Sequence, residues 1–582
     1  MIITALELWK DYKIDEFVFN ETLLNEKEID GILVKSFYFD GESYEGEDGR
    51  KEKIRIYAKL YEKSDKEREK KREEESAHLA ALGLSSLWSK DAKNAIVVFD
   101  DAINSVEYFD FTPYLEKDIS VFVVDYAGEA GTKERFTMYP NSFRDGLFEE
   151  SASHLLHNDE EDDKDDEDEG ETFVETKADL RLSRDFIWTT IAIRSCEFLK
   201  KLSYNQVGFL GVGEGGATVY RALIFDNVFT CGVTLFSHSD DMEDMEDDAL
   251  SPASYAHHIK KPLFIQVSSN EQNNSLDYMS DIFRAAPKDK AWFSVSPRVA
   301  RAISKNYKDN ILKFFELCFK DEEETVVFFL KAKGSERVLY FEFSLDGEEW
   351  VEDSVKLYLA YSQENSSYRN WKKTTFERVG KNEFISKVKV YDENKPVFAF
   401  LSATMKNGLV VSSEIVRANP KSHNIKAENA NQKRLIYDAD EMGVAEWMVL
   451  YESEKGALVT TEEGPFGIQG VTSSINILST FALADPYHIP HIGAILQIML
   501  ANMGENKEIT FAITVKNEID GEVVHEKYLS TKELARRNEW ETITLEKKDF
   551  RKGEKVLAID GNIITLEIWA NDKFLVSSVK WI

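Results

Sequence analysis

The sequence predicts an α/β domain followed by two all-β domains. In the first part, short apolar runs that suit buried strands alternate with helical segments, as in a mostly parallel sheet with helices on both faces. From Asp321 the pattern changes to period-two alternation with short turns, which indicates β-sandwiches. A polar segment, Lys421–Gln432, separates two such stretches. The 582 residues therefore divide into three predicted domains, at 1–320, 321–420 and 433–582.

The α/β part is predicted to alternate between strands and helices along the chain. An alternating stretch at 31–61 is followed by a mixed-charge helical run at 66–76. Buried strands follow at Asn94–Phe99, Ile119–Asp125, Cys231–Ser237 and Pro262–Ser268, and the stretch Gln206–Ala217 is predicted to be a buried strand, a sharp turn and the start of a helix. Arg184–Lys201 carries apolar residues at helical spacing, and a helix near Ile311–Cys318 closes the domain.

The two later domains are predicted to consist mainly of β-strands. In the middle domain we predict them at Thr325–Leu330, Val338–Phe343, Val355–Tyr361, Glu383–Val390 and Val397–Ala403. In the last domain we predict them at Ala494–Leu500, Ile509–Lys516, Trp540–Leu545, Ile563–Trp569 and Phe574–Trp581. The last set suggests a jelly-roll-like sandwich.

The most informative segment is Gln206–Ala217, which is predicted to be a buried strand followed by a sharp glycine-rich turn and a helix. Residues 211–215 (GVGEG) fit the G-x-S-x-G nucleophile elbow of α/β-hydrolases, a sharp strand-to-helix turn. The nucleophile position falls on Gly213, which has no side chain. We expect the helix to begin near Ala217. The sequence therefore predicts a hydrolase body without a hydrolase nucleophile.

Two other interpretations of this turn stay open. Gly211, Gly213 and Gly216 also fit the dinucleotide-binding pattern G-x-G-x-x-G, which needs an acidic residue at the end of the next strand. The next strand ends in Ser237-His238, and several strands come before the motif, whereas a dinucleotide-binding domain usually opens with it. Alternatively, the glycines serve only to let strand and helix pack closely.

The strongly negative net charge excludes some classes of binding partner. The net charge is −34 and the pI near 4.8, which argues against nucleic acid and anionic membrane surfaces, since both would be repelled. Much of the charge lies in an insertion near 157–172, where Asp159–Glu171 holds eleven acidic residues and one lysine. We expect that insertion to be a disordered surface loop.

No cofactor and no metal site are predicted. The cysteines Cys196, Cys231 and Cys318 are far apart and without C-x-x-C spacing, so we expect buried free thiols. No apolar run is long enough for a transmembrane helix, and no signal peptide is recognisable. A cytoplasmic location is the expectation, although a mature secreted chain with its signal removed would look the same.

On these residues the stretch from about Ile32 to Phe319 resembles the acetyl xylan esterase-like and dienelactone hydrolase-like α/β-hydrolases, a bacterial type of protein. The resemblance implies a catalytic acid after the strand ending near Val267, where Glu271 matches. It implies a catalytic histidine after a serine–proline run, where Phe293–Arg301 (FSVSPRVAR) instead places Arg301, or its neighbour Ala300, neither of which is a histidine. Nucleophile and base thus depart from the family pattern, and Gly213, Glu271 and Arg301 mark a vestigial triad.

The later domains carry weaker resemblances. Leu357–Val416 is similar to the Ig-like domain that often follows such hydrolases, and the last domain resembles carbohydrate-binding jelly rolls in a general way. In the polar loop SSYRNWKK, Trp371 is the best candidate for an exposed ring that stacks on sugar, with Tyr368 and Arg369 beside it.

Further binding candidates lie near the elbow. The backbone N–H groups of Glu214 and Gly215 could bind an anion at the helix start. His238, at the carboxyl end of a strand, could act as a displaced base. Since an arginine cannot accept a proton near neutral pH, we predict a catalytically degenerate esterase that serves as a binding or scaffolding protein. The partner would be carbohydrate or another protein. The alternative is a divergent carbohydrate esterase that uses non-standard residues.

Overall fold

The computed structural model forms two compact units. The first comprises 1–266, 282–292 and 309–325, and the second comprises 267–281, 293–308 and 326–582. The structure describes residues 4–14, 17–45, 51–64, 93–100, 110–128, 134–140, 180–237, 249–271, 276–300, 307, 309–322, 327–335, 338–346, 350–427, 433–450, 458–488, 490, 493–519, 522–558 and 563–582.

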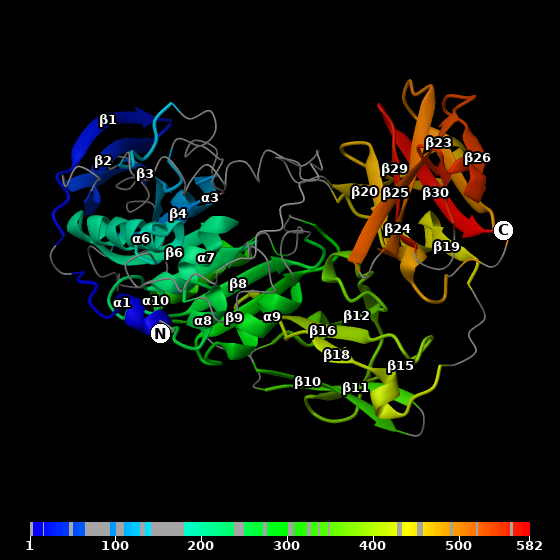
Figure 1. Cartoon of the computed structure of the whole chain (residues 1–582), viewed down its shortest axis with the longest axis horizontal. Coiled ribbons are helices and arrows are strands. Elements are labelled where there is room, and N and C mark those ends of the chain that lie inside the picture. The colour runs from blue at the N-terminus through cyan, green and yellow to red at the C-terminus, as the bar shows by residue number, and fades with distance from the viewer. Residues whose placement is uncertain are drawn as a thin grey trace, which may run out of the picture. The chain divides into compact units, whose positions relative to one another are not determined.

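A nine-stranded mixed sheet organises the α/β part (Figure 1). Its order is β1-β2-β3-β5-β4-β6-β7-β8-β9, antiparallel from β1 to β5 and parallel from β5 to β8. The strands are β1 Thr22–Ile29, β2 Ile32–Glu45, β3 Lys51–Lys63, β4 Lys93–Phe99, β5 Ile119–Asp125, β6 Tyr204–Val212, β7 Cys231–Leu235, β8 Leu263–Ser268 and β9 Ala291–Ser296. The parallel strands are buried nearly throughout, as the continuous apolar runs predict.

Helices connect these strands. They are α1 Ala5–Trp9, α3 Thr112–Glu116, α6 Arg184–Lys201, α7 Glu214–Ala222, α8 Pro252–Ala256, α9 Leu276–Ala285 and α10 Asn310–Lys320. The longest, α6, begins where the Ser183 hydroxyl accepts a hydrogen bond from the Phe186 N–H at 3.3 Å. Strand order and helices together fit the α/β-hydrolase-like domain that the sequence predicts.

Two sheets with a common core form a middle β-sandwich. One sheet has the order β10-β11-β15-β14, and the other has β13-β12-β16-β17 with β18 also paired to β16. The core side chains come from both sheets, for example Phe341 from β11 and Leu401 from β16. The strands are β10 Phe328–Ser335, β11 Val338–Leu345, β12 Lys356–Tyr361, β13 Lys372–Thr374, β14 Glu377–Arg378, β15 Glu383–Val388, β16 Val397–Thr404, β17 Val410–Ser412 and β18 Val416–Ala418.

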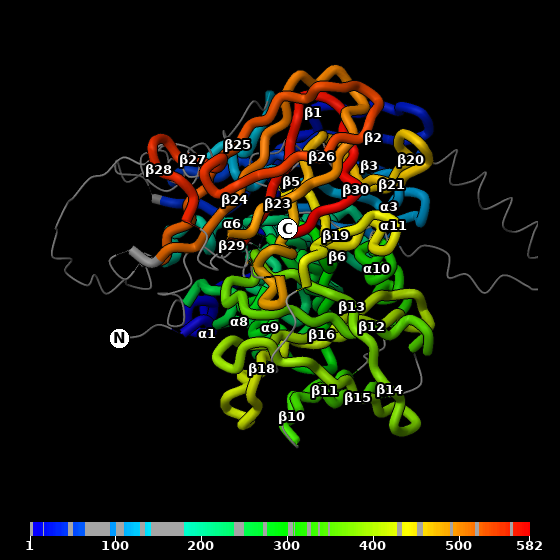
Figure 2. The backbone as a smooth tube through the Cα atoms, turned by 90° about the vertical axis from the view of Figure 1, so that its right-hand side faces the viewer, coloured from blue at the N-terminus to red at the C-terminus, as the bar shows by residue number. Residues whose placement is uncertain are grey.

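A second pair of antiparallel sheets forms the C-terminal β-sandwich. Its orders are β20-β21-β30-β23-β26, with β19 also on β30, and β22-β29-β24-β25-β27-β28. Figure 2 shows the long β24–β25 hairpin and the short strands β27 and β28 that extend its sheet. The strands are β19 Leu435–Asp438, β20 Val459–Glu463, β21 Gln469–Ser473, β22 Ile477–Thr480, β23 Leu496–Asn502, β24 Glu508–Ile519, β25 Glu522–Glu533, β26 Trp540–Leu545, β27 Arg551–Lys552, β28 Lys555–Val556, β29 Ile563–Trp569 and β30 Phe574–Trp581. A helix, α11 Ala439–Met442, follows β19.

Several expectations are confirmed, and several predicted boundaries are corrected, among them the end of β7 at Leu235 and the start of β10 at Phe328. The predicted bounds of α6, β26, β29 and β30 match the structure, and the three cysteines are buried free thiols. The helix after the elbow begins at Glu214 and not near Ala217, because the chain turns into it directly at Gly213. Of the helices in the described ranges, none is long and apolar enough to cross a membrane. The acidic insertion near 157–172 and the run at 66–76 lie outside the described residues.

Candidate functional site

The turn between β6 and α7 has the geometry of a strained elbow. Gly213 is the N-cap of α7 and has φ 56° and ψ −124°, a conformation that L side chains rarely adopt. Its N–H donates to the Leu235 carbonyl of the neighbouring strand at 2.9 Å, and its carbonyl accepts from the Gly216 N–H at 2.9 Å. Hydrogen bonds from the N–H and to the carbonyl of Gly213 thus fix the apex of this sharp strand-to-helix turn.

The other glycines of the motif are required by close packing. A Cβ at Gly211 would overlap the carbonyl of Gly215, and a Cβ at Gly215 would lie 2.7 Å from the Phe99 carbonyl oxygen. At Gly216 it would lie 2.8 Å from Oγ1 of Thr234. The interpretation of these glycines as packing residues is therefore confirmed for Gly211, Gly215 and Gly216.

Charged side chains around α7 are engaged in ion pairs. Glu214 lies 3.8 Å from the Arg184 guanidinium, and its side chain is 13% exposed. The buried Arg221 donates from Nε to the Leu250 carbonyl at 2.7 Å and lies 3.1 Å from Asp185. These pairs link α7 to the first turn of α6. Glu214 thus lies in the packing between two helices.

Aromatic rings fill the layer beside the elbow. Phe99 at the end of β4 stacks on Tyr126 after β5, with ring centroids 4.6 Å apart. Tyr126 in turn meets Trp188 of α6 edge to face at 4.7 Å. All three residues are at most 2% exposed. This layer offers apolar contact next to the Phe99 backbone against which Gly215 packs.

The segment expected to supply the triad acid is bound to the middle sandwich within the second unit. The Asn270 side chain donates to the carbonyls of Ser367 at 3.0 Å and Arg369 at 2.8 Å. The Ser367 hydroxyl donates to the carbonyl of Glu271 at 2.6 Å. Glu271 itself is 4% exposed. The structure thus brings Glu271 next to the loop that carries the predicted sugar-binding residues.

The expectation of an exposed Trp371 is wrong. Its side chain is 0% exposed, and its ring meets Phe400 edge to face at 4.8 Å. Arg369 is also 0% exposed, because it forms a two-pronged ion pair with Asp277 and stacks on Phe398. Tyr368 is partly buried and packs on Phe481 and His525 of the C-terminal sandwich. Trp371 and Arg369 therefore present no sugar-binding surface.

The structure does not describe the other residues that the sequence predicts for the site. His238 and Arg301 lie outside the described residues, as does the acidic stretch from Asp240 to Asp248. Within the ranges that the structure describes, no three His, Cys, Asp or Glu side chains come together to hold a metal ion.

Sequence reasoning missed a buried charged cluster that joins the two sandwiches. Lys372 Nζ lies 3.0 Å from Asp485 and 3.1 Å from Glu446. Asn370 donates to both carboxylates at 2.8 Å, and the Tyr487 hydroxyl donates to Asp485 at 2.8 Å. Burial raises the pKa of Asp485, although the charge of Lys372 opposes that shift. The only sequence signal was a lysine directly after a tryptophan in a polar loop, which by itself does not reveal its partners.

Comparisons with known proteins give distant structural likenesses. No protein-family model matches the sequence, and no curated protein matches it. Acetyl xylan esterase 1 from Thermoanaerobacterium sp. JW/SL YS485 is 13% identical, with 54% of this chain and 93% of that chain covered and a TM-score of 0.34. An acetyl xylan esterase from Paenibacillus sp. R4 and a glucuronoyl esterase from Solibacter usitatus are each 9% identical, with 54% and 91% covered and TM-scores of 0.34. The fold assignment rests on the strand order and the elbow of this chain.

Proposed function

We propose that this chain is a catalytically silent esterase-like α/β-hydrolase that works as a binding or scaffolding protein. The observation that carries the proposal is the apex of the elbow, where Gly213 has the strained backbone of a nucleophile position and no side chain. Acyl transfer by a triad needs a nucleophile at that apex and a base against it. Where the family pattern has its histidine, the sequence has Arg301, whose guanidinium stays protonated near neutral pH.

The packing around the elbow supports this proposal. Glu214 pairs with Arg184, and the adjoining layer consists of buried aromatic rings. The Asn270 side chain and the backbone carbonyl of Glu271 form hydrogen bonds with the middle sandwich, so these two groups join parts of the chain. These contacts are typical of structural packing and not of a catalytic centre. They therefore support a scaffolding role in which other surfaces of the chain bind the partner.

The proposal extends to the organisation of the chain. We propose an Ig-like middle domain at 321–420 and a jelly-roll-like domain at 433–582 after the hydrolase-like domain at 1–320. The partner in this proposal is carbohydrate or a protein. A fixed arrangement of the two sandwiches fits a scaffold, and the buried Lys372 cluster provides one.

A second candidate function is a divergent carbohydrate esterase. One observation favours it: Glu271, at the position of the family's acid, is retained and buried. Turnover of p-nitrophenyl acetate separates the two candidates. The proposal predicts no hydrolysis above that of the heat-denatured chain, whereas saturable turnover would favour the esterase.

A paired variant tests the ancestry of the elbow. In Gly213→Ser with Arg301→His, the missing nucleophile and base return to their family positions. Esterase activity gained by this double variant, and by neither single variant, would support descent from an active hydrolase. The single variants serve as controls, because either one lacks half of the required pair.

A further inference from the structure

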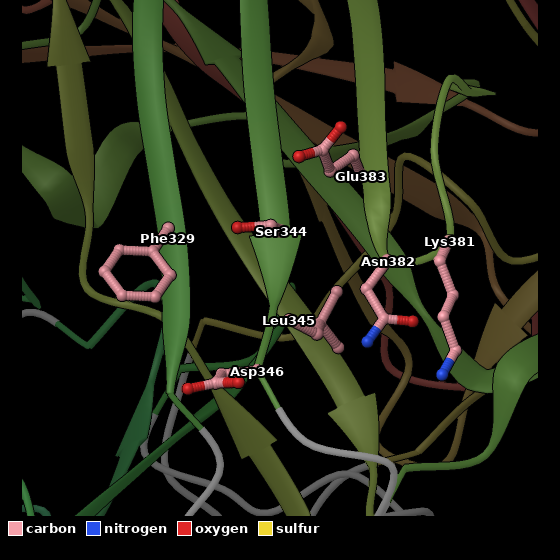
Figure 3. Close-up of a pocket in the computed structure, with 7 residues that line it drawn as sticks. All are labelled: Phe329, Ser344, Leu345, Asp346, Lys381, Asn382 and Glu383. Carbon is pink, nitrogen blue, oxygen red and sulfur yellow. The ribbon is translucent and has the colours of Figure 1, made fainter.

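The middle sandwich has a hollow on the outer side of its four-stranded sheet. The hollow measures about 510 Å³, a size that accommodates small ligands. Figure 3 shows its lining residues, which are Phe329, Ser344, Leu345, Asp346, Lys381, Asn382 and Glu383. They come from β10, from the end of β11 and from the turn that leads into β15.

Phe329 is the unusual residue of this hollow. The inward side chains of β10 and β11, such as Leu330 and Phe343, belong to the sandwich core. Phe329 faces outward on the same side as the exposed Lys331, and it is 60% exposed. Single exposed apolar residues are common, but this ring borders a concave surface. In Figure 3 the Ser344 hydroxyl points toward the ring, and Asp346 lies at the end of the same strands.

Strand register sets the polar groups beside the ring. Phe329 pairs with Ser344, and Ser344 pairs with Glu383, so the three residues form a row across three neighbouring strands. Because side chains alternate along a strand, all three members of such a row project to the same face. An aromatic surface, a hydroxyl and a carboxylate therefore lie side by side.

Two backbone hydrogen bonds and one from a side chain hold the rim of the hollow. The Asp346 N–H donates to the Val327 carbonyl at 2.9 Å, and the Leu345 N–H donates to the Asn382 carbonyl at 3.3 Å. In the turn, Arg378 Nε donates to the Gly380 carbonyl at 3.0 Å. A rim fixed before binding lowers the entropy that the protein loses when a ligand binds.

The lining chemistry selects the class of ligand. One wall is an aromatic ring, and the other lining residues are two carboxylates, an amide, a hydroxyl, one ammonium group and Leu345, whose side chain belongs to the sandwich core. Asp346 and Glu383 against Lys381 leave one excess negative charge, which disfavours anionic ligands. A neutral pyranose fits this set, since its C–H face packs on a ring while its hydroxyls donate to carboxylates and accept from Lys or Asn. We propose that the Phe329 hollow binds neutral pyranose units of a polysaccharide. This inference rests on the binding role proposed above.

The experiment uses the full chain and two named probes. Binding of xylohexaose and cellohexaose is measured by titration calorimetry for the unaltered chain, Phe329→Ala, Phe329→Tyr and Phe466→Ala. We expect at least one probe to bind, Phe329→Ala to weaken that binding at least tenfold, and Phe329→Tyr to keep it. Phe466 is the matched control, because it is an 89% exposed phenylalanine on the C-terminal sandwich. Phe466→Ala should therefore bind as the unaltered chain does.

Three results would overturn the inference. They are binding of neither probe, equal binding by Phe329→Ala and the unaltered chain, and loss of binding in Phe466→Ala alone. Unchanged melting of Phe329→Ala, expected for an exposed side chain, shows that lost binding is not unfolding. Hydrolysis of p-nitrophenyl acetate by the chain would defeat the proposed silent centre and leave this binding result standing, so the two failures are distinguishable.

Discussion

Lys372 and Asp485 form a largely buried ion pair, with 3.0 Å between Nζ and the carboxylate and side chains that are 26% and 2% exposed, and the pair links the middle sandwich to the C-terminal sandwich. Asp485 is 1% exposed and Glu446, the second carboxylate on the same lysine, is 8% exposed. One cation thus faces two acids in a site with little access to water. Such a cluster costs desolvation energy to form, but removing one member leaves an uncompensated buried charge.

We predict that Lys372→Met destabilises the chain by roughly 3–5 kcal/mol, because both carboxylates lose their counter-charge. The measurement is the urea unfolding of the β-sandwich region. Lys573→Met is the matched control, since its pair with Glu462 is 43% and 41% exposed and should contribute about 1 kcal/mol at most. Equal unfolding midpoints for the two variants would contradict the assignment of a buried link.

Trp371 should matter for stability and not for sugar binding. Because its ring is fully buried against Phe400, Trp371→Ala should cost about 3–5 kcal/mol in unfolding free energy. Trp371→Phe should recover part of that loss, since it keeps an aromatic ring in the same space. If Trp371→Ala melted like the unaltered chain and lost affinity for an oligosaccharide instead, the burial described above would be refuted.

His488 predicts a dependence of stability on pH. Burial lowers its pKa to about 4, although a hydrogen bond to the Lys433 carbonyl opposes this, and the positive charges of Lys372 and Lys433 lower it further. Between pH ~6.5 and ~4 this histidine is protonated in the unfolded chain and neutral in the folded chain. The free energy of unfolding therefore falls as the pH falls through this range.

The histidine contribution is measured as a difference between two chains. The raised pKa of Asp485 acts in the opposite direction, because the folded chain then binds a proton more readily than the unfolded one. Comparing the unaltered chain with His488→Gln cancels that term. We expect the stability difference between them to change by on the order of 3 kcal/mol from pH 7 to pH 4. Parallel stability curves for both chains would rule out a neutral buried His488.

Gly211 should tolerate no side chain. A Cβ there would overlap the Gly215 carbonyl, a backbone atom that cannot move without distorting the elbow. We predict a loss of stability of about 1–3 kcal/mol or more for Gly211→Ala, seen as a lowered melting temperature of the α/β part. Gly443→Ala is a control in which the added methyl meets no atom within 4 Å and only the positive φ opposes it. Melting of Gly211→Ala above that of Gly443→Ala would be evidence against the packed elbow.

Local patterns in the sequence predicted the elements well. The bounds of α6, β26, β29 and β30 follow from hydrophobic periodicity, because each buries one face or both against a neighbour. The strand β25 was not predicted, since charged residues occur on it at both inward and outward positions, as Glu526 and Lys527 show. The buried Glu526 accepts hydrogen bonds from Tyr528 of the same strand and from Asn517 of the neighbouring β24, and periodicity does not reveal the contact between the two strands.

In the candidate site, too, local sequence patterns predicted some features, whereas features that depend on tertiary contacts could not be predicted. The elbow and its empty apex were readable, because a sharp strand-to-helix turn needs glycine at fixed offsets. The burial of Trp371 and Arg369 was not, because it depends on Asp277, Phe398 and Phe400 from elsewhere in the chain. Polar neighbours in a loop predict exposure only while the loop has no tertiary partner. The Phe329 hollow likewise depends on the register of three strands and is visible only in the folded chain.

The central claim is that no nucleophile stands at the elbow. The most direct measurement is the intact mass of the unaltered chain after incubation with a fluorophosphonate, which labels activated serines covalently. The account predicts an unchanged mass, and an adduct on Gly213→Ser with Arg301→His would show that the reagent can reach the elbow. A stoichiometric adduct on the unaltered chain, mapped to any serine of the α/β part, would contradict the account.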